Sequence, residues 1–197
     1  MKRKVLVIVA VASALLLSGC SNVNMAAKVG KKEITTKDVQ TSINNILKER
    51  AKFDTSSNTN IATGAQLNIS VLQFHLYSAL FDSIAAGAKI PVSDGDIAKQ
   101  RAALVAQVGS EDKLPVALAN ASIAVEDFPR YLRSIVIVAK LKQALVAAGD
   151  TSTDGSGLQK VIIAAGKREG VVINPRYGAW DVEAGTIKQA AANPAIK

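Results

Sequence analysis

The sequence predicts a mainly α-helical fold of five to six helices with one small β element. Three observations lead to this prediction. Ala, Val, Ile and Leu are abundant while aromatic residues make up only 4% of the chain, which is typical of helices that pack through small side chains. Apolar residues recur at helical spacing in several segments. Residues that commonly cap helices, Thr35 and Ser93, stand directly before two of these segments.

The predicted β element combines segments from the two ends of the domain. Val29 is followed by Gly30, Lys31 and Lys32, which indicates a turn between two short strands. The β-branched residues around Val172 also favour a strand. We expect the segment near Val172 to pair with the segment near Val29 and to join the two ends of the fold.

The helices are predicted from caps and apolar stripes. Thr35 with Asp38, and Ser93 with Asp96, have the spacing of capping boxes. Residues 66–86 carry apolar side chains over more than half of the helix circumference, so this should be the central and most buried helix. The other helices are expected at residues 35–50, 93–109, 111–120, 125–148 and 157–169.

One domain is expected over residues 27–181. A polar linker at 149–157 interrupts it, because Gly, Asp, Ser and Thr dominate that stretch. Residues 182–197 are expected to form a flexible tail.

The chain start has the features of a lipoprotein signal. Lys2, Arg3 and Lys4 precede an apolar run that is too short for a comfortable membrane span. Leu17-Ser18-Gly19-Cys20 resembles a bacterial lipobox. This implies cleavage of a signal peptide at residues 1–19, diacylglyceryl attachment at Cys20 and a lipidated tether at 20–26. The alternative is an ordinary secretory signal in which the cysteine is incidental.

Charge and cysteine content limit the partners. The net charge is +8, which suits a surface of anionic lipids for an anchored protein, whereas export makes nucleic acid an unexpected partner. We therefore expect an extracytoplasmic protein on the outer face of the cell membrane, or on an outer membrane if the cell has one. Cys20 is the only cysteine, so disulfides within the chain and metal sites built on several thiolates are excluded.

The sequence offers no motif for catalysis. His75 is the only histidine and lies on the apolar central segment without an acidic residue within one helical turn, so we interpret it as a core or surface residue and not as a base or metal ligand. No nucleophile motif or phosphate-binding glycine loop is present. We expect no enzyme activity, no catalytic residue, no metal and no cofactor.

Aromatic residues near the C-terminus have a structural interpretation. Pro175, Tyr177 and Trp180 would be costly to expose together. We expect them to pack the end of the chain against the domain, in preference to binding a ligand directly.

Several segments, in order, resemble SurA/PrsA/trigger-factor-like chaperones. They are "AAKVGKKEITTKDVQ", "IPVSDGDIAKQ", "LPVALANASIAVEDFPRYLRSIVIVAKL" and "INPRYGAWD", which together extend over most of residues 27–181. The resemblance implies a SurA N-terminal-type helical domain. In PrsA-like proteins and SurA, a parvulin prolyl-isomerase module separates the last two helices, whereas this chain has only "AAGDTSTDGSG" there.

The resemblance implies a chaperone-like function without isomerase activity. The first hypothesis is a membrane-anchored, extracytoplasmic holdase that binds unfolded or partly folded exported proteins. Its candidate client-binding residues are Phe74, Tyr77, Phe81 and Tyr131. The alternative is an accessory or scaffold lipoprotein that binds one specific folded envelope partner. The sequence leaves the client, the partner and the oligomeric state open.

Overall fold

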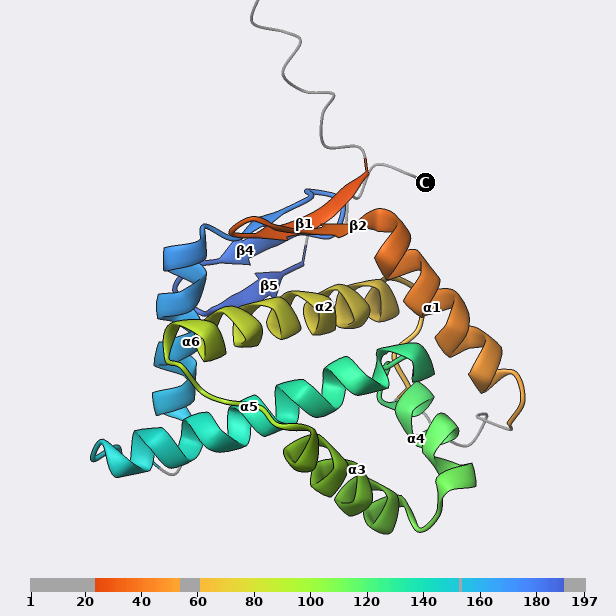
Figure 1. Cartoon of the computed structure of the whole chain (residues 1–197). Coiled ribbons are helices and arrows are strands. Elements are labelled where there is room, and N and C mark those ends of the chain that lie inside the picture. The colour runs from red at the N-terminus through yellow and green to blue at the C-terminus, as the bar shows by residue number, and fades with distance from the viewer. Residues whose placement is uncertain (1–23, 54–60, 153, 190–197) are drawn as a thin grey trace, which may run out of the picture.

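A computed structural model describes residues 24–53, 61–152 and 154–189 (Figure 1). The predicted mainly α fold with a small β element is confirmed. The helices are α1 (Thr36–Arg50), α2 (Gly64–Gly87), α3 (Asp94–Val108), α4 (Leu114–Asn120), α5 (Phe128–Ala147) and α6 (Ser156–Glu169). The strands are β1 (Met25–Val29), β2 (Lys32–Thr35), β3 (Val172–Ile173), β4 (Ala179–Asp181) and β5 (Thr186–Lys188).

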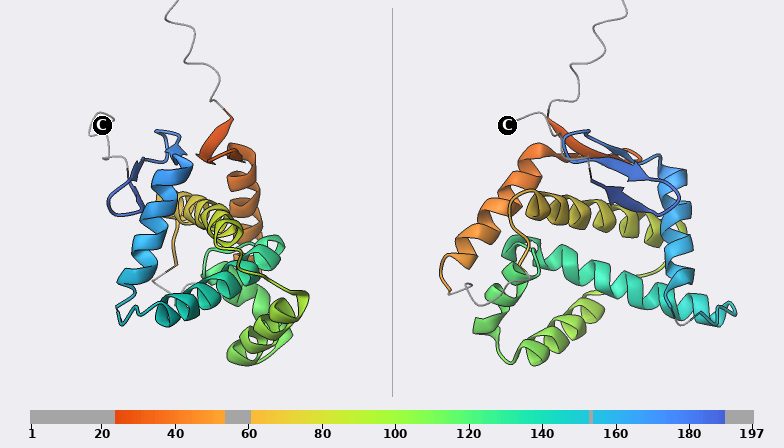
Figure 2. Two further views of the ribbon diagram at one scale, coloured as in Figure 1. Left: turned by 60° about the vertical axis from the view of Figure 1, so that its left-hand side comes forward. Right: turned by 180° about the vertical axis from the view of Figure 1, so that it is seen from behind.

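The strands form two small sheets on one side of α2 (Figures 1 and 2). The first has the order β2-β1-β3, and both of its strand pairs are antiparallel. Lys28 is opposite Val172 and Ala27 is opposite Ile173, so the predicted pairing between the two ends of the domain is present. β4 and β5 form the second sheet as a separate hairpin.

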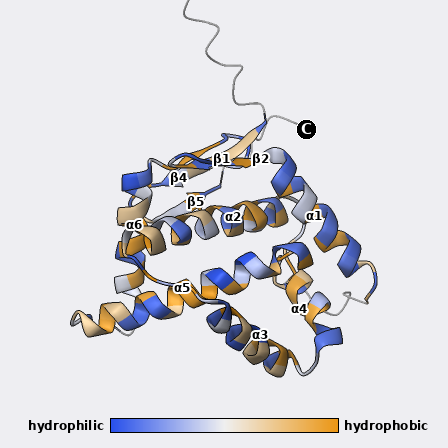
Figure 3. Cartoon of the chain, viewed as in Figure 1, coloured by the Kyte–Doolittle hydropathy of each residue, from blue (hydrophilic) through white to orange (hydrophobic). Residues whose placement is uncertain are grey.

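Helix α2 is the central element, as its composition predicts. Leu72, Leu76 and Leu80 are fully buried, and the helix is packed by α1, α5, α6 and the first sheet. Figure 3 shows its strong apolar character. Within the described residues, α2 is the one helix with the length and hydropathy of a membrane span. Here that apolar surface is used to build a protein core.

The apolar residues form two cores. The main core lies between the first sheet, α1, α2 and α6. The second core is smaller and lies between α4 and the start of α5, with α3 against it; its buried residues are Leu114, Leu118, Ile123, Phe128 and Leu132. No residue of α3 is fully buried. Its apolar side chains are partly buried against the second core. Lys140 of α5 adds polar contacts, since its Nζ lies 2.7 Å from Asp96 Oδ2 and 2.8 Å from Pro91 O.

The predicted caps explain where two helices begin. The Thr35 hydroxyl accepts from the Asp38 N–H at 3.0 Å, and Asp38 accepts from the Thr35 N–H at 2.9 Å. Ser93 and Asp96 make the same reciprocal pair at the start of α3. Each capping box satisfies N–H groups that a helix leaves without intrahelical partners. Gly109 ends α3 with φ of 99°, a conformation that glycine adopts without a steric cost.

Arg50 links the last turn of α1 to α4 and to the segment before α2. Its side chain is only 6% exposed. Nε and one terminal nitrogen donate to Ala119 O at 3.0 and 2.8 Å, and the other terminal nitrogen donates to Ala62 O at 2.7 Å. The cation therefore satisfies carbonyl groups at the end of α4 and in the segment before α2. Burial lowers the pKa of Arg50 from its ordinary value.

Three expected boundaries were wrong. The tether was expected to reach residue 26, but Met25 and Ala26 are buried in β1. Met25 is opposite Thr35 of β2, and Ala26 O accepts from the Asn174 N–H. The tail was expected to begin at 182, but Thr186–Lys188 pairs with β4. The linker was expected to reach 157, whereas α6 begins at Ser156 after Gly155, which has φ of 80°.

Replacing Arg50 tests its role in joining α1 to α4 and to the segment before α2. Arg50→Met should lower the free energy of unfolding by about 2–4 kcal/mol, because it removes charged hydrogen bonds and leaves buried carbonyl groups unpaired. Chemical denaturation followed by circular dichroism measures this change. The matched control is Lys48→Met, at an exposed position of the same helical turn, which should change stability by less than about 0.5 kcal/mol. Equal effects from the two substitutions would contradict the assigned role.

Candidate functional site

The contact between α2 and α5 has a hollow on each side of it. Ser134 Oγ on α5 lies 3.2 Å from Ser78 Oγ on α2, and these small side chains allow the two helices to approach closely. Ser78 lines both hollows. One hollow is an apolar groove and the other is a polar pocket that extends to α1 and β2.

The apolar hollow, which we name the α2–α5 groove, has a volume of about 460 Å³. All four predicted client-binding residues line it: Phe74, Tyr77 and Phe81 from α2 and Tyr131 from α5. All four are half-buried, so their rings border the groove and also contact the protein interior. The remaining lining residues are Ser78, Ser134, Ile135, Val138, Ala139 and Lys142.

The aromatic residues are held in defined positions. The Tyr77 hydroxyl donates to Gly185 O in the β4–β5 turn at 2.9 Å, and burial raises the pKa of Tyr77. The ring of Tyr77 lies 6.2 Å from that of Phe81, and the ring of Phe74 lies 6.4 Å from that of Tyr131. Phe74 and Tyr131 also pack against the second core. These two rings therefore have a structural role beside any binding role.

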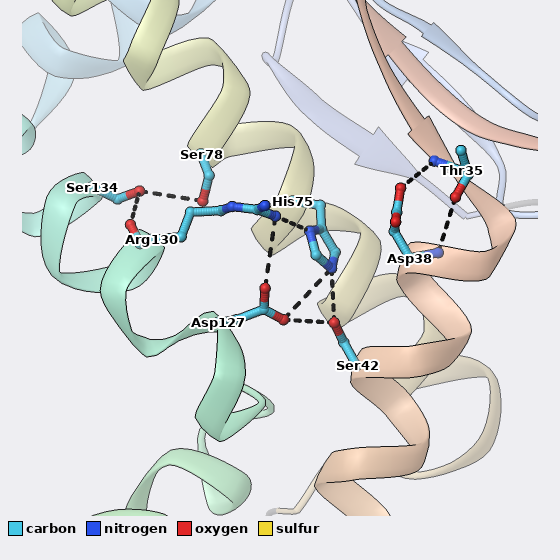
Figure 4. Close-up of polar contacts among 8 residues, drawn as sticks. All are labelled: Thr35, Asp38, Ser42, His75, Ser78, Asp127, Arg130 and Ser134. Atoms are coloured by element: carbon cyan, nitrogen blue, oxygen red, sulfur yellow. Dashed lines mark hydrogen bonds and ion pairs between the residues drawn. The ribbon is translucent and has the colours of Figure 1, made fainter.

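The polar pocket contains Ser42, His75, Asp127 and Arg130 (Figure 4). These residues come from α1, α2, the 3-10 turn Val125–Asp127 and α5. His75 is 5% exposed. Ser42 Oγ lies 3.0 Å from His75 Nε2 and donates to Asp127 Oδ2 at 2.6 Å, while an Arg130 nitrogen lies 2.6 Å from His75 Nδ1. The cluster joins three helices at one point.

The direction of these hydrogen bonds excludes activation of Ser42 by His75 in this arrangement. Arginine can only donate, so Nδ1 of His75 must accept from Arg130. The proton of the neutral ring is then on Nε2, which donates to Ser42 Oγ. A histidine that acts as a general base toward serine needs a lone pair on the nitrogen facing the hydroxyl. The cluster is therefore a structural network despite its Ser-His-Asp composition.

Burial keeps His75 neutral. Loss of hydration is the largest effect and lowers the pKa of His75 from 6.5; Asp127 opposes that shift, Arg130 adds to it, and Asp38 opposes it. At Asp38, burial acts to raise the pKa of the carboxyl, but the hydrogen bonds with Thr35 outweigh it and lower that pKa. The interpretation of His75 as a core residue agrees with its position.

The tail aromatics lie beside α6. Tyr177 and Trp180 pack against the main core, whereas Pro175 is exposed. A Cβ atom at Gly166 would lie 2.9 Å from the Trp180 ring, so glycine at this position of α6 provides the space for the indole. Trp180 Nε1 is buried and has no hydrogen-bond partner within the described residues.

The predicted lipid site lies outside the described residues, and those residues contain no candidate metal site. Over residues 24–53, 61–152 and 154–189, no group of three or more His, Cys, Asp or Glu side chains is arranged to hold a metal ion. The predicted signal peptide and the lipid attachment residue Cys20 lie outside the described residues.

Comparison with known families identifies the fold family. A model of the SurA-like N-terminal domain matches residues 2–142. The chain belongs to the SurA-like N-terminal domain family. The matched segment ends within α5, so it includes α1 to α4, the first hairpin and both walls of the α2–α5 groove. The comparisons with curated proteins and with solved structures gave no significant match.

Family membership confirms the resemblance that the sequence motifs indicated. It relates the chain to the SurA chaperones, in which the N-terminal domain is the non-catalytic chaperone part. No enzymatic family was indicated, and no parvulin module was found beside the matched domain.

Some residues that line each hollow were not predicted from the sequence. The α5 wall of the groove includes Ile135, Val138 and Ala139, whose spacing marks one helix face but does not show that the face stays uncovered. Asp127 and Arg130, which both contact His75, lie about fifty residues from it in the chain. Only the packing of α1 and α5 against α2 brings them together.

The neutral state of His75 makes stability depend on pH. Because the folded-state pKa is below 6.5, the unfolded chain takes up a proton that the folded chain resists. This contribution to stability is complete above pH 6.5 and is lost as the pH falls from 6.5 toward the folded-state pKa. Urea unfolding at pH 7.5 and pH 5.5 should show a lower midpoint at pH 5.5. His75→Gln should reduce that difference, and an unchanged difference would contradict the buried neutral state.

Proposed function

We propose that this protein is a membrane-anchored, extracytoplasmic holdase that binds unfolded or partly folded exported proteins and has no prolyl isomerase activity. The observation that carries the proposal is the α2–α5 groove, an apolar surface hollow with four aromatic side chains in a SurA-like domain. Leu72, Leu76 and Leu80 of α2 are covered by other elements, whereas this side of the helix presents an apolar surface that remains open.

The dimensions of the groove favour weak and reversible binding. A volume of about 460 Å³ accommodates a few apolar side chains of an extended segment. Each buried large apolar side chain contributes about 1.5–3 kcal/mol, from which the cost of ordering the client is subtracted. Aromatic and aliphatic walls accept many apolar side chains, because contacts between such surfaces have little directionality. A holdase needs this combination of low affinity and low selectivity.

The connection between α5 and α6 supports the absence of isomerase activity. Residues 148–155 join Ala147 at the end of α5 to Ser156 at the start of α6. A domain needs at least about 50 residues, so this connection cannot contain a parvulin module. The proposed function therefore depends on binding alone.

Anchoring would place the groove where exported chains appear. The signal-like start and Cys20 support attachment of acyl chains, each of which adds about 0.8 kcal/mol of membrane affinity per buried methylene. A tethered domain meets clients near the membrane at a high local concentration, so weak binding is sufficient.

A charge in the groove should weaken client capture. Ala139 is exposed and lines the groove on α5, whereas Ala144 is exposed on the same helix and does not line it. Ala139→Glu should require about tenfold more chain to suppress aggregation of reduced insulin by half, corresponding to a loss of about 1.4 kcal/mol. Light scattering measures the aggregation. The chain has one cysteine, so the reductant breaks no disulfide within it.

Ala144→Glu is the matched control, because it adds the same charge to α5 outside the groove and should suppress aggregation as the wild type does. Circular dichroism verifies that both variants are folded. Equal activity of Ala139→Glu and Ala144→Glu would contradict the assignment of the groove, and no suppression by the wild-type chain would contradict holdase activity itself.

A further inference from the structure

A second apolar groove lies at the opposite side of the domain, between the C-terminal end of α6 and the segment from β3 to β4. Its volume is about 500 Å³, and Val172, Pro175, Trp180 and Val182 contribute to its walls. Val172 is 49% exposed and Val182 is 42% exposed. These two exposed valines extend the apolar surface beyond the hollow.

This groove is next to the beginning of β1. The Asn174 N–H donates to Ala26 O at 2.9 Å, and Asn174 Nδ2 donates to Met25 O at 2.8 Å. Lys28 is opposite Val172 in the first sheet. Five residue steps separate Met25 from Cys20, so an acyl group at Cys20 would hold Met25 within about 17 Å of the bilayer surface. The groove would then be among the parts of the domain nearest to the membrane.

Positive charge flanks the groove. Gly30 N–H donates to Glu169 O at 3.0 Å, which places the turn containing Lys31 near the start of β3. Lys28, Lys31 and Arg176 are exposed, and Lys28 lies opposite Val172. Within the described residues none of these three cations forms an ion pair, whereas Lys167 is paired with Glu183 at 2.9 Å. These unpaired cations complement anionic lipid headgroups, which attract each nearby Lys or Arg by about 1 kcal/mol.

We propose that the sheet-end surface, formed by Lys28, Lys31, Val172, Pro175, Arg176 and Val182, lies against an anionic lipid bilayer. The proposal rests on the part of the proposed function that anchors the chain at Cys20. It goes further by giving the domain a fixed orientation. The sheets face the bilayer, and α5, on the other side of α2 (Figures 1 and 2), holds its wall of the α2–α5 groove away from it.

Few contacts are sufficient for this orientation, because the tether makes the association intramolecular. At an effective concentration in the millimolar range or above, an interaction of only a few kcal/mol keeps the surface bound to the bilayer most of the time. Two exposed valines and three cations can supply an interaction of this size.

Trp180 offers a direct test, because it is the only tryptophan in the chain and it lines this groove. The processed protein is reconstituted into vesicles of phosphatidylethanolamine and phosphatidylglycerol that contain lipids with a quencher near the headgroup. Trp180 fluorescence should be quenched, and Val172→Ser combined with Val182→Ser should reduce the quenching by about half, since part of the apolar contact is lost. Val146→Ser is the control, because Val146 is 67% exposed at the end of α5, and it should leave the quenching unchanged.

Three results would overturn the proposal: no quenching, equal quenching in the double variant, or no acyl group on Cys20 by intact mass spectrometry. Suppression of insulin aggregation is measured with the same vesicles. Loss of quenching with normal suppression contradicts only the membrane-facing surface. Loss of suppression with normal quenching contradicts only the holdase activity.

Discussion

The apolar surface of α2 is the constraint on which the rest of the structure depends. Leu72, Leu76 and Leu80 are fully buried along it, and an apolar helix of this length has no stable place in water unless other elements cover it. The first sheet covers one side, α1 and α6 cover others, and α5 covers part of the side opposite the sheet. The pairing of β1 with β3 closes this arrangement, because it joins segments from both ends of the chain over the same helix.

The polar pocket and the α2–α5 groove lie on the two sides of the contact between α2 and α5. On one flank, Ser42, His75, Asp127 and Arg130 satisfy each other's hydrogen bonds and hold three helices together. On the other flank, small side chains let the helices meet while larger rings border an open groove. The hydrogen bonds on the polar flank fix the helices relative to one another, and the apolar flank provides the open groove. The proposed holdase activity does not need a titrating catalytic group, and the tautomer of His75 is unsuited to activating Ser42.

Local signals in the sequence were sufficient for much of the fold. Thr35 with Asp38 and Ser93 with Asp96 mark helix starts through contacts within four residues, and the apolar pattern of α2 shows its burial directly. The hairpin of β4 and β5 was missed, because three-residue strands have too little pattern and this hairpin depends on distant contacts such as Tyr77 with Gly185. The four aromatic groove residues were selected for their type and helix, but the α5 wall and the Arg130–His75 contact depend on helix packing that no local pattern specifies.

Photo-crosslinking in cells tests the central claim most directly. Benzoylphenylalanine replaces Phe81, a half-buried residue of the α2–α5 groove, and mass spectrometry identifies the chains that become attached after irradiation. We expect many unrelated exported proteins to be captured in partly folded form, and none of them to be captured when the crosslinker replaces Ala144. A single folded envelope partner, or the same set of proteins from both positions, would contradict it.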